Sequence, residues 1–261
     1  PALNGSALTN IDAATVSTTA PSSPAQGDMW FDSTAGTTAM KVYNGTAWDQ
    51  MSNKFTATGG TITSGSGYKY HTFTSSGTFT AETTGAVDYL IVAGGASSGA
   101  TTSHNGSWSG GGGAGGAIQT NSHTVSAQDY SIVIGAGGSH KANGSNSTAF
   151  GSTAIGGGYP GTNVGNAASG GSGGGAGGDN GSYTNGQGSG TSGQGNAGGA
   201  GYDPAPEGCG GGGGKGAVGG SAGSGGAGTG GTGINLSAWA TATSTGDGGY
   251  YAGGGGGASG R

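Results

Sequence analysis

Runs of glycine fill the second half of this chain and limit how it can fold. Residues 208–220 read GCGGGGGKGAVGG, and similar runs cover residues 109–117, 170–178, 219–228 and 253–260. Each glycine inside a helix or strand costs about 0.5–1 kcal/mol relative to alanine and brings no side chain to bury. The runs are therefore either flexible linkers or extended polyproline-II-like rods, which have about three residues per turn.

A bundle of such rods would be held together by its backbone. A polyproline-II rod makes no internal hydrogen bonds, so its N–H and C=O groups are free to bond neighbouring rods, and glycine lets those rods come close. Of the 71 glycines, 10 lie in residues 1–93 and 61 in residues 94–261, and the strict Gly-X-Y repeat of collagen is absent. We predict an ordered bundle over residues 94–261, with disordered linker as the alternative.

Composition and charge argue against several classes of protein. Hydrophobic residues make up 30% of the chain, against about 45–50% in globular proteins, which is too few for one conventional core. Six basic and eleven acidic residues give a net charge of −5 without a basic stripe, so neither nucleic-acid binding nor a polybasic membrane anchor is expected. The longest apolar run, YLIVA at residues 89–93, is far shorter than the roughly 20 residues of a membrane span.

Two smaller sequence features bear on processing. Cys209 is the only cysteine, so no intrachain disulfide is expected. The chain starts at Pro1 and shows no signal-peptide pattern, which is typical of a fragment or a processed product.

The first 52 residues suggest a fibre segment followed by a small β-meander. Residues 1–26 carry few and irregularly spaced apolar side chains, which suits short strands whose core is shared by several chains. Residues 27–52 predict strands at 30–31, 39–43 and 47–51, and Asn44-Gly45 predicts a type I′ hairpin turn. Trp30 and Trp48 are interpreted as a packed mini-core, with a carbohydrate platform as the alternative.

Residues 53–93 predict a β-strand region from which the bundle starts. Segments of strand length alternate or run apolar at residues 68–73, 77–81 and 87–93, and shorter strands are expected at 117–119, 123–125, 130–134, 148–150 and 154–155. The expected parts are thus 1–26, 27–52, 53–93 and the glycine-rich bundle 94–261. The fold class is mostly β and irregular, with almost no α-helix.

Polar and aromatic inserts separate the glycine runs. They cover residues 97–109, 139–147, 159–169, 179–196, 202–207, 234–247 and 250–251. Rods that turn back and forth would place alternate inserts at the same end, and binding sites often lie on loops that a rigid scaffold presents together. Asn-Gly-Ser/Thr triplets are interpreted as turns rather than glycosylation sites; they start at Asn4, Asn44, Asn105, Asn143 and Asn180.

The inserts carry isolated aromatic rings and carboxylates that suit ligand binding. Tyr and Trp offer a flat face and a polar group at low entropic cost, and carboxylates accept hydrogen bonds from hydroxyl groups. The alternative is that some of these rings shield rod ends from water. The candidate binding residues are His104, Trp108, Tyr159, Asp179, Tyr183, Tyr202, Asp203, Glu207, Trp239, Asp247, Tyr250 and Tyr251.

No motif predicts catalysis. Lys215 follows a glycine run, but a phosphate-binding loop would need glycine in place of Cys209 and Ser or Thr in place of Gly216. The four histidines are His71, His104, His123 and His140. They lack metal-ligand spacing, and neither a Ser-His-Asp arrangement nor a carboxylate pair is evident. We expect a protein that is not an enzyme and needs no cofactor, although the acidic inserts would suit a calcium ion.

Several segments resemble known families. Residues 1–52, with LNGSALTNIDAATVSTTAPSSPAQGDMWFDS and KVYNGTAWDQM, resemble the shaft and connector segments of bacteriophage tail fibres. Residues 70–156, with YHTFTSSGTFT, VDYLIVAGG, YSIVIGAGG and NSTAFGSTAIGGG, resemble the glycine-rich domain of many phage and marine bacterial proteins. The glycine runs and inserts beyond are similar to the polyglycine-II sandwich of tail-fibre tip adhesins.

These resemblances imply a function in host attachment. In tip adhesins the loops at the far end of the bundle contact the host, which implies that the inserts bind a surface glycan or an outer-membrane protein. Because a fibre-like segment precedes the glycine-rich part, the resemblance implies a homotrimer that joins other tail-fibre and virion proteins outside the cell. Nucleic-acid partners and membrane insertion are not expected.

A purely structural, self-associating glycine-rich fibre or virion decoration protein is the alternative function. A structural rod would repeat itself, whereas these inserts differ in length and carry isolated aromatic residues. An ice-binding surface needs a flat face of Thr and Ala, for which residues 238–245 (AWATATST) are the nearest stretch.

Overall fold

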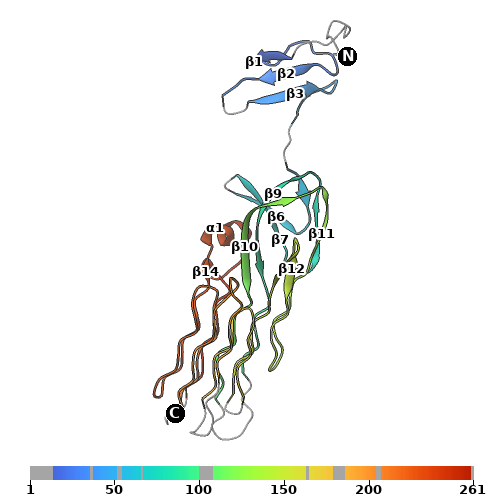
Figure 1. Cartoon of the computed structure of the whole chain (residues 1–261). Coiled ribbons are helices and arrows are strands. Elements are labelled where there is room, and N and C mark those ends of the chain that lie inside the picture. Colours follow the sequence, from blue (N-terminus) through green and yellow to red (C-terminus); the bar gives the residue numbers. More distant parts are fainter. Residues whose placement is uncertain are drawn as a thin grey trace, which may run out of the picture. The chain divides into compact units, whose positions relative to one another are not determined.

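A computed structural model describes residues 14–35, 38–51, 55–65, 67–99, 108–162, 165–178, 186–203 and 207–259. The chain divides into two compact units, Pro1–Lys54 and Phe55–Arg261. Short strands and extended segments make up most of the described residues, with one short helix among them, which confirms the expected fold class (Figure 1). The finer division into residues 1–26, 27–52, 53–93 and 94–261 stays a prediction.

The first unit is a small sheet built around Trp30. Its strands, in the order of the sheet, are β1 (Thr15–Ser17), β2 (Met29–Asp32), β3 (Ala39–Tyr43) and β4 (Trp48–Gln50). β1 runs parallel to β2, and the other pairs are antiparallel. Trp30 is buried, packs edge-on against Trp48 with ring centroids 5.5 Å apart, and donates its Nε1–H to Ser17 O at 3.1 Å. The two tryptophans therefore form a packed mini-core.

The β3–β4 hairpin lies where Asn44-Gly45 predicts it, but its turn is not type I′. Tyr43 pairs with Trp48, so four residues form the loop, and Asn44 is not at positive φ. The Asn44 Oδ1 atom instead accepts the backbone N–H groups of Thr46 and Ala47 at 2.9 and 2.8 Å. The asparagine side chain thus closes the turn, and Gly45 alone takes a positive φ of 102°.

The ion pair in this sheet makes the stability of the first unit depend on pH. Lys41 Nζ lies 2.8 Å from Asp32 Oδ2, and the Lys41 hydrogen bond is the main reason that the pKa of Asp32 falls from 3.8 to about 2. A lowered pKa stabilises the folded state above about pH 4, and this contribution is lost as pH falls toward 2. We predict that Asp32→Asn weakens the unit at neutral pH and removes this acid-dependent step, as followed by tryptophan fluorescence. Asp49→Asn, at an exposed position of β4, is the matched control and should keep the step.

The second unit begins with several small antiparallel sheets. Its strands are β5 (Ala57–Thr58), β6 (Thr61–Gly65), β7 (Tyr68–Thr72), β8 (Gly77–Ala81), β9 (Gly85–Val92), β10 (Ala117–Val125), β11 (Gln128–Ile132), β12 (Ser147–Ala149), β13 (Ser152–Ala154), β14 (Ile234–Asn235) and β15 (Tyr250–Tyr251). β9 pairs with β10, β8 lies between β11 and β5, and the remaining sheets are the hairpins β6–β7, β12–β13 and β14–β15.

An aromatic cluster lies at the centre of these sheets. Phe79 and Tyr89 are buried, and the ring of Phe150 lies 5.5 and 5.2 Å from their rings. Phe150 and Gly151 form the two-residue loop between β12 and β13 with positive φ values of 50° and 76°. A positive φ is unfavourable for a bulky residue, so the ring contacts of Phe150 offset a local backbone cost of about 1–3 kcal/mol.

Glycine-rich rods continue from these strands and pack side by side (Figure 1). Along the rod formed by residues 109–116, Gly110, Gly113 and Gly116 donate their N–H groups to the rod 155–161, at 3.0, 3.0 and 2.8 Å. The intervening Gly111 and Ala114 donate to the rod 208–214 at 2.9 and 3.0 Å. Every third N–H group thus points to the same neighbour, which is the period of a polyproline-II-like rod.

Close approach of the rods requires glycine inside the bundle. A Cβ atom at Gly212 would lie 2.0 Å from the carbonyl oxygen of Gly112, and one at Gly175 would lie 2.1 Å from that of Gly210. Backbone atoms cannot yield to such contacts without breaking the hydrogen bonds between rods. The prediction of a bundle held by backbone hydrogen bonds is confirmed for the described rods, and the alternative of a disordered linker is wrong for them.

Two inserts differ from their expected form. Residues 234–247 contain the helix α1 (Ser237–Thr243), so the stretch 238–245 does not form an extended flat face. The carbonyl group of Ala242 accepts the hydroxyl hydrogen of Thr63 at 2.7 Å, which holds α1 against β6. Asn143-Gly144 does not form a turn either, because Asn143 lies in an extended segment and its Oδ1 atom accepts the N–H of Tyr159 at 2.9 Å.

Candidate functional site

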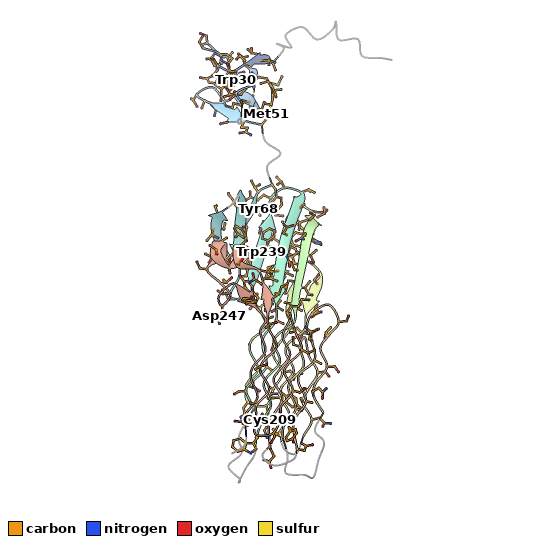
Figure 2. The ribbon with its side chains drawn as sticks, turned by 90° about the vertical axis from the view of Figure 1, so that its left-hand side faces the viewer. Trp30, Met51, Tyr68, Cys209, Trp239 and Asp247 are labelled. Atoms are coloured by element: carbon orange, nitrogen blue, oxygen red, sulfur yellow. The ribbon has the colours of Figure 1, made fainter. Side chains whose placement is uncertain are left out.

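Several rods meet in one hydrogen-bonded layer, which we call the loop end, at the end of the bundle away from the strands. Ala258 donates its N–H to Ser109 O at 3.2 Å and accepts the N–H of Cys209 at 2.9 Å. Ser109 Oγ donates to Gly161 O at 3.2 Å, and Gly178 donates its N–H to Cys209 Sγ at 3.2 Å. Figure 2 shows Cys209 at this end, whereas Trp239 and Asp247 lie beside the strands.

Four of the candidate binding residues lie at the loop end. Trp108 directly precedes the layer, and Tyr202 exchanges two backbone hydrogen bonds with Gly208, at 2.8 and 3.1 Å. Asp203 follows Tyr202, and Glu207 precedes Gly208. All four side chains are half-buried, so each rests against the scaffold and keeps a solvent-facing part. The chain enters and leaves the stretches 100–107, 179–185 and 204–206 close to this layer.

Cys209 anchors the loop end rather than reacting there. Its side chain is fully buried, and burial raises the pKa of its thiol. The thiol therefore stays protonated at neutral pH, and its role is to fill space and accept the hydrogen bond from Gly178.

Of the other candidates, Tyr159 lies on one of the described rods, and three lie outside the described residues. Tyr159 is half-buried on the rod 155–161, two residues before Gly161, where its carbonyl oxygen accepts the N–H of Ala168 at 2.9 Å. It therefore lies on the flank of the bundle near the loop end. His104, Asp179 and Tyr183 lie outside the described residues.

The remaining four candidates lie at the opposite, strand end. Trp239 on α1 packs edge-on against Tyr70 of β7, with ring centroids 6.2 Å apart. Tyr251 donates to or accepts from the Thr245 hydroxyl at 2.7 Å, and Asp247 exchanges two backbone hydrogen bonds with Tyr250. Trp239 thus packs against a ring that is distant in sequence, because α1 lies beside β7, and the Tyr251 hydroxyl group has a hydrogen-bond partner in Thr245.

Sequence reasoning missed the aromatic residues that accompany Trp239. Tyr68 and Tyr70 lie two residues apart on β7, so they share one face of the hairpin, and their ring centroids are 6.3 Å apart. Tyr68 is 61% exposed and continues the row that Trp239 and Tyr70 begin (Figure 2). The alternation Tyr-Lys-Tyr was the available signal, but only the fold brings it next to α1.

The loop end suits a neutral, hydroxyl-rich ligand better than an acidic one. The described residues there contribute the carboxylates of Asp203 and Glu207 and no Lys, Arg or His. No group of three or more His, Cys, Asp or Glu residues in the described part of the chain could hold a metal ion. Among the same residues, no helix is long and apolar enough to cross a membrane.

Comparison with known proteins identifies the second unit. Neither the curated proteins nor the solved structures include a significant match to the chain. The family model of the glycine-rich domain matches residues 72–261, which include all the described rods and most strands of the second unit. The chain therefore belongs to the glycine-rich domain family.

Proposed function

We propose that this chain is the distal, receptor-binding part of a bacteriophage tail fibre. The observation that carries the proposal is the loop end, where segments far apart in sequence are brought together on hydrogen-bonded rods. The resemblance of residues 1–52 to tail-fibre shaft and connector segments supports it. The chain would act outside the cell as part of the virion, as a non-enzymatic homotrimer joined to other fibre proteins.

The side chains at the loop end favour a glycan as the receptor, with an outer-membrane protein as the second possibility. The rings of Trp108 and Tyr202 offer faces for the C–H surface of a sugar, and the carboxylates of Asp203 and Glu207 accept hydrogen bonds from its hydroxyl groups. An acidic ligand would meet two carboxylates and no cation among the described residues of the loop end.

The rods make the scaffold rigid, which favours binding. A loop that is held in its bound geometry loses less conformational entropy on association. Several copies on one virion would then add avidity, because each further contact forms at a high effective concentration.

The test is adsorption of the labelled full-length protein to a panel of Gram-negative cells. We expect the double variant Trp108→Ala and Tyr202→Ala to bind at least about tenfold more weakly than the wild type, since aromatic anchors dominate such interfaces. Tyr250→Ala, which removes a 48%-exposed ring at the strand end, is the matched control and should bind within about twofold. Melting curves establish that the variants remain folded.

Two treatments of the cells distinguish the receptors. Periodate, which cleaves vicinal diols, should abolish adsorption if the receptor is a glycan, and protease treatment should abolish it if the receptor is a protein. Equal binding by wild type and the loop-end double variant would refute recognition through Trp108 and Tyr202. A wild type that binds no cell and assembles into filaments would support the purely structural alternative.

A further inference from the structure

A groove of about 250 Å³ runs along the side of the bundle and is lined mainly by glycine backbone. Its floor is the rod 109–116, and its two walls are the rods 93–99 and 252–259. Ala96 donates its N–H to Gly113 O and Gly255 donates to Gly112 O, each at 3.0 Å, so both walls are bonded to the floor. No hydrogen bond joins the described residues of one wall to those of the other, and the groove lies between them.

Each of the three rods has one set of N–H groups that donates to no described residue. In the rod 252–259, Gly254 and Gly257 donate to the rod 226–233, and Gly255 and Ala258 donate to the floor. The third set, Gly253 and Gly256, donates to no described residue and lines the groove. The same holds for Gly95 and Ser98 of the other wall and for Gly112 of the floor. The residues that line the groove therefore include some whose N–H groups donate to no described residue, at the three-residue spacing of a rod.

Three of the wall glycines, Gly95, Gly253 and Gly256, are not required by contacts with the described residues of this chain. A Cβ atom at Gly95, Gly253 or Gly256 would lie 4.0, 3.8 or 3.9 Å from its nearest neighbour, which is ordinary van der Waals contact. Other outward-facing positions of the bundle do carry side chains, as exposed Val218, Thr229 and Thr232 show. Because these wall positions carry no side chain, the groove stays open. A further rod could then pack closely against the walls through its backbone.

We propose that the groove binds a glycine rod from a second copy of this chain, formed by residues 253–257. This run of five glycines lies at the edge of the bundle with its third set of N–H groups unpaired, so it can be both a wall of one groove and the occupant of another. The rods pack in parallel and antiparallel pairs, as Gly111 with Gly210 and Gly110 with Gly161 show, so either orientation of the second copy is possible. Insertion of the rod of each copy into the groove of the next, around a threefold axis, would close the assembly at three copies, in agreement with the proposed homotrimer.

The test introduces a thiol into the proposed contact in the full-length protein. Gly256→Cys should give an interchain disulfide on mild oxidation, because the rods 253–257 of two copies lie side by side. Thr229→Cys, an exposed position on the neighbouring rod, is the matched control and should stay monomeric on denaturing gels. Cys209 is fully buried and does not contribute.

A second variant measures the strength of the contact. Gly256→Val fills the groove of the partner, so we expect association to weaken by about tenfold or more in sedimentation velocity at several concentrations, whereas Thr229→Val should leave it unchanged. Melting temperatures near that of the wild type would confirm that both variants fold. The proposal is overturned if the wild type is monomeric at every concentration, or if Gly256→Cys forms no disulfide in the associated protein.

Discussion

Replacing Gly212 by alanine is expected to unfold the glycine bundle. The new Cβ atom would lie 2.0 Å from Gly112 O, which is itself held by the N–H of Gly255 at 3.0 Å. Gly212 also donates to Gly255 at 2.8 Å and accepts from Gly231 at 2.9 Å, so neither backbone can move without breaking bonds to a third rod. We expect a loss of at least about 3 kcal/mol, seen by calorimetry as a lower or absent transition of the second unit.

Gly137→Ala is the control for this prediction. A Cβ atom at this exposed glycine would lie 3.7 Å from its nearest neighbour, Gly95 O. Both variants replace glycine by alanine, but at position 137 no rod has to shift. The unfolding transition of the second unit should therefore stay close to that of the wild type. A large destabilisation by both changes would show that the loss comes from altered backbone freedom rather than from the packing of rods.

Phe79→Ala is expected to destabilise the second unit by about 3–5 kcal/mol. Phe79 is 4% exposed. Its ring centroid lies 5.2, 5.5 and 6.4 Å from those of His71, Phe150 and Tyr130. Truncation leaves a cavity among rings that cannot collapse into it. It also removes a contact that holds Phe150 at a positive φ. Chemical denaturation, monitored by far-ultraviolet circular dichroism, measures the loss in the free energy of unfolding.

Tyr68→Ala is the matched control on the neighbouring hairpin. It removes an aromatic ring of similar size that is 61% exposed, and it should cost less than about 1 kcal/mol. If Phe79→Ala were equally mild, the strands would not depend on this aromatic cluster, and backbone hydrogen bonds between rods would hold the unit alone.

Much of the fold could be predicted because glycine leaves the backbone few choices. Once helices and ordinary strands are excluded, the runs can form only packed rods or disordered linker. Strand positions followed from alternation, and the predicted ranges 39–43 and 77–81 coincide with β3 and β8. The hairpin at Asn44-Gly45 was located correctly, although its turn type was wrong, because the asparagine side chain closes a four-residue loop.

Features that depend on tertiary contacts could not be predicted. Phe150 takes a conformation that local rules reserve for glycine or asparagine, since its ring fills the aromatic cluster. Helix α1 has no side-chain cap and no buried residue of its own, so its contacts with β6 and β7 favour it. Its position is the reason that Trp239 lies far from Trp108.

The sequence also did not show at which end of the bundle each insert lies. It depends on where each rod turns, and some turns carry no obvious signal. The turn of residues 191–194 lies at the strand end, where Gln194 accepts the N–H of Ile155 at 2.8 Å and donates to Thr153 O at 3.0 Å. In the sequence this stretch belongs to the same insert as Asp179 and Tyr183. Polar composition alone therefore cannot show which residues face a ligand.

The scarcity of hydrocarbon inside the bundle has a consequence for its response to temperature. The buried hydrophobic residues among its described rods include only small side chains, such as those of Ala114, Ala176 and Cys209. Exposure of apolar surface raises the heat capacity of unfolding, and exposure of polar backbone lowers it. The heat capacity change per residue should therefore lie below the usual value of about 12–15 cal/mol/K, which makes the stability curve shallow. The second unit, and with it the geometry of the loop end, would then stay folded over a wide range of temperature.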